Sequence, residues 1–311
     1  MPPVAGGQNP GMRLGTYDDG NRRRAAVAVG DELVDADVAA RRAGLTGADG
    51  WSSVRAIIAQ PREDLARLEE AAAALARDGD RETVRAREAT RLGPPVPDPQ
   101  KIICIGLNYR AHAAEASLEE ASVPTVFAKW ANALVGEGAP IELREPYVDD
   151  LDYEAEVAVV IGRRVRDIAE SDALDAIAGW MPLNDVSARG LQIQTSQWTA
   201  GKAMDGSAPC GPFLVLDDAL REGGLELESR INGEQMQHAH TDAMIFPVAK
   251  LVAFVSSWAT LEPGDIIATG TPEGVGMHRD PPRYLRDGDT VEIRVGSEVL
   301  RNPVVRVRPR G

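Results

Sequence analysis

The chain has 311 residues, of which 43% are hydrophobic and 26% are charged, as in folded globular proteins. Its formal net charge of −14 disfavours nucleic acid and anionic membranes as partners, because the average field repels polyanions. No apolar run approaches the ~20 residues of a membrane span, and the first ten residues lack the order of a signal peptide. Two cysteines, Cys104 and Cys210, exclude a disulfide framework. We therefore expect a soluble cytoplasmic protein.

The first part of the chain is predicted to fold as a small α/β domain. Over residues 12–38, apolar and polar residues alternate around turn signals, which predicts a small sheet. From Pro61 to about Ala89, the sequence is rich in Ala, Glu, Leu and Arg, which predicts a helical segment with a break near Gly79. We infer no catalytic role for this domain.

A proline-rich stretch separates this domain from the rest of the chain. The sequence G-P-P-V-P-D-P from Gly93 to Pro99 favours a stiff, extended connector. We place the boundary there, with one domain over residues 1–95 and a second over residues 96–311. Beyond the connector, short apolar runs bounded by turn residues predict a strand-dominated α+β fold with few helices, one of them over Ala173–Trp180.

Three acidic residues of the second domain raise the question of how their charges are balanced. The stretch L-D-Y-E-A-E-V-A-V-V-I-G places Glu154 and Glu156 at the start of an apolar strand, where residues two apart point to the same face. Asp185 follows another apolar stretch and could complete a set of three oxygen ligands. Buried carboxylates need a shared proton, an arginine or a divalent cation, and hard cations favour carboxylate oxygen. Solvated acids on a polar strand face give the same spacing, so the pattern alone leaves both interpretations open.

A histidine and a glutamate form a second candidate group. In N-Y-R-A-H-A-A-E, His112 and Glu115 are three residues apart, so on a helix they share a face and can hydrogen bond. A carboxylate on one ring nitrogen leaves the other nitrogen free to take a proton from water, as a general base does. Chance pairing in an alanine-rich helix is the competing interpretation.

Two loops supply further candidates. Lys202 stands among Gly, Ser and Pro in A-G-K-A-M-D-G-S-A-P, where a fixed cation could balance developing negative charge. In I-I-A-T-G-T-P-E-G-V-G, a strand enters a glycine-rich turn that can present backbone N–H groups at Gly270 and the Thr271 hydroxyl to an anion. His238 and His240 in Q-H-A-H are interpreted as solvated loop histidines rather than as a second metal site.

Taken together, six motifs in order resemble the fumarylacetoacetate hydrolase family. They are G-L-N-Y-x-x-H-x-x-E, D-Y-E-x-E-V-A-V-V-I-G, N-D-V-S-A-R-x-x-Q, G-K-x-x-D-x-x-x-P-x-G-P, M-I-F and T-L-x-P-G-D-I-I-x-T-G-T-P-x-G-V-G. The match covers roughly residues 101 to 307, and the set is specific although each motif alone is weak.

The resemblance implies a mixed β-sandwich roll of this family, preceded by a small N-terminal α/β domain, in a homodimer. It also implies a divalent cofactor, Mg²⁺ or Mn²⁺, with Ca²⁺ as a substitute in a crystal. The motifs assign three metal ligands, three catalytic groups and four substrate-binding residues. The metal ligands are Glu154, Glu156 and Asp185, and the catalytic groups are His112, Glu115 and Lys202. The substrate-binding residues are Arg189, Gln192, Gly270 and Thr271.

The activity that the resemblance implies is metal-dependent hydrolysis of a C–C bond in an acylpyruvate or another 2,4-diketo acid, through a metal-bound pyruvate enolate. Decarboxylation of an oxaloacetate-like acid, or isomerisation of a 2-hydroxymuconate-like acid, would use the same residues and stays an alternative. A catalytically silent binding protein with this fold is a third. The role of Lys129 in F-A-K-W stays open, because related sequences often have proline after this lysine.

Overall fold

The computed structural model describes residues 11–45, 47, 50–79, 83–117, 119–144 and 148–308. Within this part of the chain, none of the helices combines the length and the apolar character that crossing a bilayer needs. The elements of the first segment are β1 (Met12–Asp18), β2 (Arg23–Val29), β3 (Glu32–Asp35), α1 (Ala36–Arg42), α2 (Val54–Ile57), α3 (Arg62–Asp78), β4 (Val84–Ala86) and β5 (Leu92–Gly93).

The predicted sheet and helix of this segment are present, with one difference. Helix α3 ends at Gly79, which adopts a left-handed φ of 68° that glycine tolerates without a Cβ clash. Residues 80–82 lie outside the described part, and the chain then forms strand β4 rather than more helix, pairing with β3. Pairing with an existing sheet edge outweighs the helical propensity of the sequence at that point.

The second segment is strand-dominated, as predicted. Its first elements are β6 (Ile102–Gly106), α4 (Arg110–Glu115), β7 (Thr125–Lys129), the 3₁₀ helix η1 (Ala131–Ala133), β8 (Leu134–Val135), β9 (Ile141–Arg144), β10 (Leu151–Asp152), β11 (Ala155–Ile161), the 3₁₀ helix η2 (Glu170–Ala176), β12 (Ile177–Asn184), β13 (Ser187–Ala188), α5 (Arg189–Gln192) and α6 (Thr199–Lys202). The remainder are β14 (Ala208–Pro209), β15 (Leu214–Leu216), α7 (Ala219–Glu222), β16 (Glu226–Ile231), β17 (Glu234–His240), the 3₁₀ helix η3 (Thr241–Ala243), α8 (Val248–Trp258), β18 (Ile266–Ala268), the 3₁₀ helix η4 (Gly276–His278), β19 (Thr290–Val295) and β20 (Glu298–Val307).

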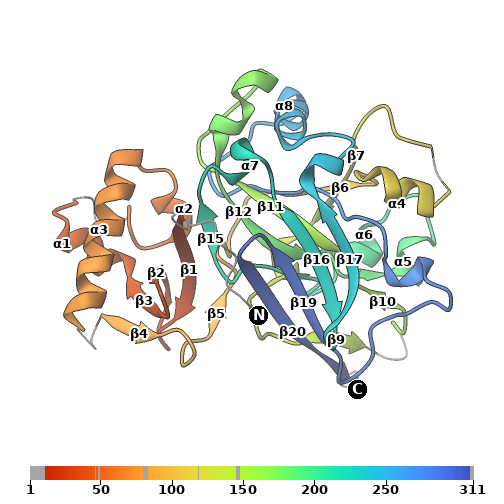
Figure 1. Cartoon of the computed structure of the whole chain (residues 1–311), viewed down its shortest axis with the longest axis horizontal. Helices are drawn as coiled ribbons and strands as arrows, with labels where there is room; N and C mark the ends of the chain where they lie inside the picture. The colour runs from red at the N-terminus through yellow and green to blue at the C-terminus, as the bar shows by residue number, and fades with distance from the viewer. Residues whose placement is uncertain are drawn as a thin grey trace.

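Two mixed sheets organise the described residues. The larger has the order β4-β3-β2-β1-β15-β12-β11-β18-β6-β7, with β5 paired to β1. The smaller has the order β17-β16-β19-β20-β9 and lies across the larger one in Figure 1. Apolar side chains from both sheets form one core cluster, which includes Val157 and Val159 of β11 and Ile293 of β19. The predicted strand-dominated α+β class is confirmed.

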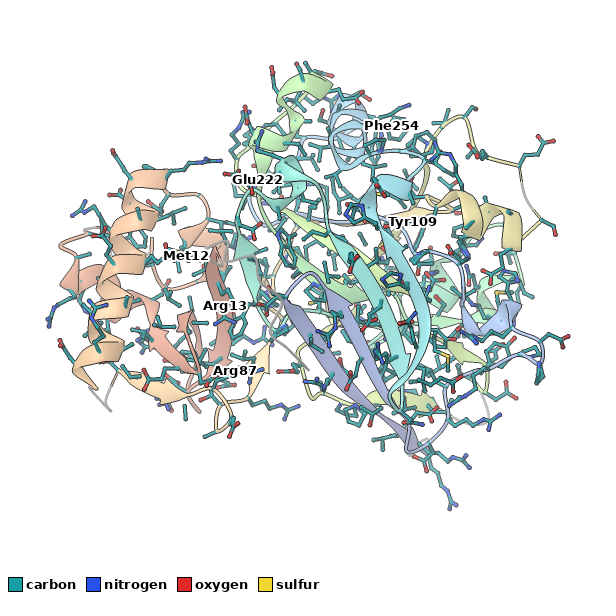
Figure 2. The ribbon with its side chains drawn as sticks, viewed as in Figure 1. Met12, Arg13, Arg87, Tyr109, Glu222 and Phe254 are labelled. Carbon is teal, nitrogen blue, oxygen red and sulfur yellow. The ribbon has the colours of Figure 1, made fainter. Side chains whose placement is uncertain are left out.

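The two segments share the larger sheet. Strand β1 pairs antiparallel with β15, with Leu14 opposite Leu214, so hydrogen bonds run across the predicted boundary. Two arginines of the first segment, Arg13 and Arg87, hold their guanidinium carbons 5.2 Å and 5.5 Å from the centre of the Phe213 ring. Both are labelled in Figure 2, on the side of the first segment that faces strand β20. The division into two domains at residue 95 stays a prediction.

Two predicted local structures are wrong. The stretch Ala173–Trp180 is not one helix, because a 3₁₀ turn ends at Ala176 and strand β12 begins at Ile177 to pair with β11. His238 and His240 lie on strand β17 rather than in a loop. In both places, pairing between strands that are distant in sequence decides the conformation, which local composition does not report.

Candidate metal and acid–base site

The three acids predicted as metal ligands meet at one place. One carboxylate oxygen from each of Glu154, Glu156 and Asp185 lies within 4.8 Å of the other two, and all three side chains are buried. Strand pairing brings them together, because β11 and β12 pair with Ala155 opposite Asn184. The backbone N–H of Asp185 also donates to the Glu154 carbonyl oxygen at 3.0 Å. The cluster is therefore built into the sheet.

Glu156 and the valines Val157 and Val159 lie on opposite faces of strand β11. Glu156 shares its strand face with Ala158 and Val160, which pack in the second core cluster, whereas Val157 and Val159 pack in the first. Strand β11 is buried on both faces, so neither face exposes these acids to water.

Three buried cations surround the carboxylates. Lys202 Nζ lies 2.7 Å from Glu154 Oε2 and 2.9 Å from Asp185 Oδ2. Lys129 Nζ lies 2.9 Å from Asp185 Oδ1, and Arg189 Nη1 lies 2.7 Å from Glu154 Oε1. Burial alone would raise the pKa of Glu154, but Lys202 and Arg189 outweigh burial and lower it. Likewise, Asp185 and Glu154 outweigh burial and raise the pKa of Lys202.

Glu156 is the carboxylate without a cation at contact distance among the described interactions. The backbone N–H of Gly270 donates to its Oε2 at 2.9 Å. Burial, Asp185 and Glu154 raise the pKa of Glu156 well above its ordinary value. Including the neighbouring Asp152, four buried carboxylates stand against three buried cations. The cluster thus carries one more negative than positive charge when all seven groups are ionised.

The residues present fit a divalent cation. A donor set of three carboxylates suits a hard ion such as Mg²⁺, Mn²⁺ or Ca²⁺. An excess buried negative charge costs several kcal/mol unless a proton or a cation compensates it. A divalent ion held by Glu154, Glu156 and Asp185 would turn the excess of one negative charge into one positive charge, which favours an anionic ligand. Which metal is bound stays a prediction.

His112 and Glu115 form the predicted pair on helix α4. His112 Nδ1 lies 3.2 Å from Glu115 Oε2, and the His112 side chain is buried. The backbone N–H of Gly274 lies 3.1 Å and 3.2 Å from the two Glu115 carboxylate oxygens. Burial raises the pKa of Glu115, but these hydrogen bonds outweigh it and lower the pKa. One turn links the pair to the carboxylate cluster, because Gly270 N–H donates to Glu156 and Gly274 N–H donates to Glu115.

The predicted substrate-binding residues already have protein partners. Arg189 Nη1 donates to Gln192 Oε1 at 2.9 Å, and both residues lie on α5 beside the cluster. Gly270, with a φ of 100°, sits where an added Cβ would lie 2.7 Å from the Asn108 Cβ. The Thr271 hydroxyl accepts a hydrogen bond from Gln237 Nε2 at 2.8 Å. The structure thus brings Arg189 and Gln192 to the cluster and ties the Gly270 turn to it through Glu156, while their roles toward a substrate stay predictions.

The sequence interpretation left the role of Lys129 open and did not single out Asp152. Lys129 is buried and donates to the carbonyl oxygens of Val186 and Ser207 at 3.2 Å and 2.8 Å, and also to that of Lys202. Its role is therefore to hold the loops that carry Asp185 and Lys202. Asp152 is fully buried against Arg189. The alternation D-Y-E-A-E, with three acids two residues apart, was the signal that could have identified Asp152.

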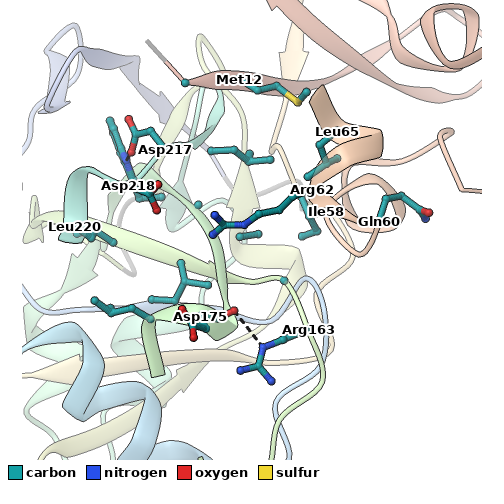
Figure 3. A pocket seen from close by; sticks show the side chains of 18 of the residues that line it. Met12, Ile58, Gln60, Arg62, Leu65, Arg163, Asp175, Asp217, Asp218 and Leu220 are labelled. Atoms are coloured by element: carbon teal, nitrogen blue, oxygen red, sulfur yellow. Dashed lines mark hydrogen bonds between the residues drawn. The ribbon is translucent and has the colours of Figure 1, made fainter. Parts of the chain in front are cut away.

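A cavity of the described residues lies away from this site. It encloses about 500 Å³ between helices α2 and α3 and the second segment, and its lining contains none of the predicted site residues. Figure 3 shows Arg62 reaching into it opposite Asp217 and Asp218. Arg221 and Asp175, which both line this cavity, form an ion pair with one another.

Comparison with known proteins agrees with this geometry. Residues 101–305 match the family model described as fumarylacetoacetate hydrolase C-terminal. The oxaloacetate tautomerase YisK of Bacillus subtilis is 43% identical over 210 residues, 66% of this chain and 69% of that protein. The mitochondrial oxaloacetate tautomerase of Xenopus laevis is 39% identical over 226 residues, 71% and 70% of the two chains.

Solved structures extend the similarity to nearly the whole chain. A fumarylacetoacetate hydrolase from Exiguobacterium antarcticum superposes with a TM-score of 0.77 at 31% identity, covering 95% of this chain and 100% of that one. The maleylpyruvate hydrolase of Sphingobium sp. SYK-6 gives a TM-score of 0.74 at 29% identity, with the same coverage. The family match, the relatives and the carboxylate cluster agree, and the chain belongs to the fumarylacetoacetate hydrolase family.

Proposed function

We propose that this chain is a divalent-metal-dependent enzyme that interconverts the enol and keto forms of oxaloacetate or a similar 2-oxo dicarboxylic acid. The observation that carries the proposal is the buried cluster of Glu154, Glu156 and Asp185, which the turn from Gly270 to Gly274 links to the His112–Glu115 pair. Together with Asp152, the cluster has one more carboxylate than it has buried cations. Two relatives about 40% identical bear the name oxaloacetate tautomerase, which favours this reaction over other reactions at the same site.

The chain's own residues can supply the proton transfers. Conversion of the enol to the keto acid moves one proton from the oxygen on C2 to the carbon C3, with no net gain or loss of atoms. The His112 imidazole can donate or accept this proton. Glu115 would hold the ring in place and stabilise the positive charge of the protonated imidazole. A bound divalent ion would polarise the keto oxygen and favour the enolate form of the acid.

The charged groups around the cluster suit a substrate with a carboxylate. Arg189 and Lys202 are buried cations that do not lose their charge at neutral pH, and both lie beside Glu154. Asp152, Glu154 and Gln192 already engage the nitrogens of Arg189, so this guanidinium would act on a substrate carboxylate through its charge. Gln192, which accepts from Arg189 Nη1, would hold that guanidinium in place.

Hydrolysis of a C–C bond in an acylpyruvate is the second candidate. The His112–Glu115 pair favours it, because activating a water requires a general base of this kind, and a similar solved structure is a maleylpyruvate hydrolase. The two candidates differ in whether water enters the carbon skeleton. Both reactions would use the carboxylate cluster and the His112–Glu115 pair. Analysis of the products therefore distinguishes the two reactions better than mutation of these residues does.

The test is to add enol oxaloacetate to protein with Mg²⁺ or Mn²⁺ and to follow the loss of enol absorbance while NMR records the products. Faster equilibration to the keto acid with an unchanged carbon skeleton supports the proposal. Pyruvate and carbon dioxide from oxaloacetate would indicate a decarboxylase instead, and two acids from an acylpyruvate would indicate the hydrolase. If none of these acids is converted, the chain would be a binding protein without catalytic activity, and the proposal would be wrong.

A homodimer and a 2-oxo acid ligand are parts of the same proposal. Trp130 and Ile193 are exposed apolar side chains that follow β7 and α5, the elements that carry Lys129 and Arg189, and an interface would cover such groups. Light scattering on the protein as it elutes from a size-exclusion column measures the mass of the particle in solution. A mass near twice 33.3 kDa supports the dimer.

A further inference from the structure

Asp152 is a buried carboxylate whose oxygens accept four hydrogen bonds. Its Oδ1 accepts from the backbone N–H groups of Tyr153 at 2.9 Å and Gly276 at 2.7 Å. Its Oδ2 accepts from Met277 N at 2.9 Å and from Arg189 Nε at 2.8 Å. Asp152 is fully excluded from solvent. Two of these four donors belong to one short turn, and one belongs to the arginine beside Glu154.

That turn, residues 274–278, also contacts the His112–Glu115 pair. At its first residue, Gly274 N donates to Glu115 at 3.1 Å. At its last residue, the His278 ring lies edge-on to the His112 ring, with 6.1 Å between the ring centres. Asp152 holds the turn between these two points. The turn therefore connects Asp152 to both members of the pair.

The approach between Asp152 and the turn requires a glycine. A Cβ at Gly276 would lie 2.5 Å from Asp152 Oδ1 and 2.2 Å from the Arg283 carbonyl oxygen. The side chain at position 152 must be an acceptor at both oxygens, because all its partners are N–H donors. An asparagine would keep one acceptor and would point an NH₂ group at N–H donors on the other side.

We propose that Asp152 is a positioning residue that fixes Arg189 and the 274–278 turn together, and so couples the carboxylate-binding side of the site to the His112–Glu115 pair. The inference rests on the proposed function for the roles of Arg189 and His112, whereas the coupling itself is a property of the protein without substrate. Asp152 does not touch the reacting atoms and acts through these two groups.

The first experiment measures the coupling without substrate or metal. Hydrogen exchange followed by mass spectrometry compares the wild type with Asp152→Asn and with a matched control, Asp149→Asn. Asp149 is exposed on the same segment, and its change removes the same charge. In Asp152→Asn, amides of the turn and of helix α4 are expected to exchange about tenfold faster or more, because losing hydrogen bonds to a buried charge makes local opening easier. The hairpin β19–β20 and the whole control protein should exchange as in the wild type.

The second experiment measures the coupling in the reaction. Asp152→Asn should raise KM, through Arg189, and lower kcat, through His112, with a combined loss of about 10- to 100-fold in kcat/KM. Combining it with Glu115→Gln should cost less than the product of the two single losses, because both changes act on the same pair. Losses that multiply, or a single variant with wild-type kinetics, would overturn the proposal.

Failure of the proposed function leaves a different result. If the wild type has no activity on any 2-oxo acid but the turn and α4 loosen together in Asp152→Asn, the coupling stands and the reaction is wrong. If activity is present but exchange in the turn is unchanged, the coupling is wrong. Should Asp152→Asn fail to fold, Gly276→Ala is the second variant, because its added Cβ would push the turn away from Asp152. We expect it to give the same exchange pattern. Failure of both to fold would make Asp152 a general stability residue and overturn its positioning role.

Discussion

The Lys202 ammonium lies 2.7 Å from Glu154 Oε2, inside the group of oxygens that would hold a metal ion. It also lies 2.9 Å from Asp185 Oδ2, so one lysine compensates two of the three carboxylates. The lysine and a divalent ion therefore compete for the same negative charge. Their competition makes the stability of the protein depend on the metal in a way that a surface ion pair would not.

Replacing this lysine by an apolar residue tests the competition. In Lys202→Met without metal, Glu154 and Asp185 lose a buried partner, which costs about 3–5 kcal/mol of the free energy of unfolding. Saturating Mn²⁺ should restore more stability to Lys202→Met than to the wild type. Thermal melts with and without Mn²⁺ measure both effects. Equal Mn²⁺-induced shifts of Tm in the two proteins would contradict the competition.

His112 should affect the reaction but not the metal site. His112→Ala is expected to lower kcat by about 10²-fold or more, because general acid–base catalysis is lost. Its Mn²⁺ affinity should stay near the wild-type value, since His112 is not one of the clustered oxygen donors. His238→Ala is the control, because that histidine is half exposed on β17. Full activity in His112→Ala would remove this residue from the mechanism.

Lys129 should matter for stability more than its sequence context suggests. Its ammonium is buried against Asp185 and several carbonyl oxygens. Lys129→Met leaves these acceptors without a donor and should cost about 3–5 kcal/mol in urea unfolding. Lys250→Met, at an exposed position of α8, should change the free energy of unfolding little. Similar values for the two variants would show that Lys129 does not anchor the loops.

Glu298, at the junction of the two segments, is expected to make the free energy of unfolding depend on pH. This glutamate on β20 is buried, with Arg13 at 3.6 Å, and burial raises its pKa above the ordinary value of 4.5 in spite of the arginine. Ionisation is therefore harder in the folded state than in the unfolded state. Stability that is fully present below the unfolded pKa is lost as the pH rises through the folded pKa.

Glu298→Gln should accordingly raise the free energy of unfolding near pH 7 and change it little near pH 4. Urea unfolding at both pH values measures the difference. Because glutamine keeps hydrogen-bonding capacity toward Arg13, the comparison isolates the charge. A variant that is less stable than the wild type near pH 7 would show that the ion pair outweighs burial.

The sequence predicted the fold class and the three acids that cluster, but not every local conformation around them. Glu154, Glu156 and Asp185 stand within six ordered motifs, and chemistry constrains such residues strongly, so their convergence could be expected. The conformation of Ile177–Asn184 could not, because that stretch becomes a strand only through pairing with β11. Its local composition carries no information about a partner that precedes it in the chain.

The open role of Lys129 and the omission of Asp152 have a common physical reason. Lys129 and Asp152 act through buried hydrogen bonds to backbone groups of distant segments, such as Ser207 and Gly276. Those groups have no residue-specific signature in a sequence. Only the structure shows that Lys129 and Asp152 are buried and held by these hydrogen bonds.

Glu154, Glu156 and Asp185 are expected to hold a doubly charged ion that compensates the excess negative charge of the buried cluster. The direct measurement is calorimetric titration of Mn²⁺ into chelator-treated protein, in the wild type and in Glu156→Gln. The account predicts one ion per chain in the wild type and affinity at least about tenfold weaker in Glu156→Gln, since a ligand and the uncompensated charge are both lost. An absence of binding, or equal affinity in the two proteins, would contradict it.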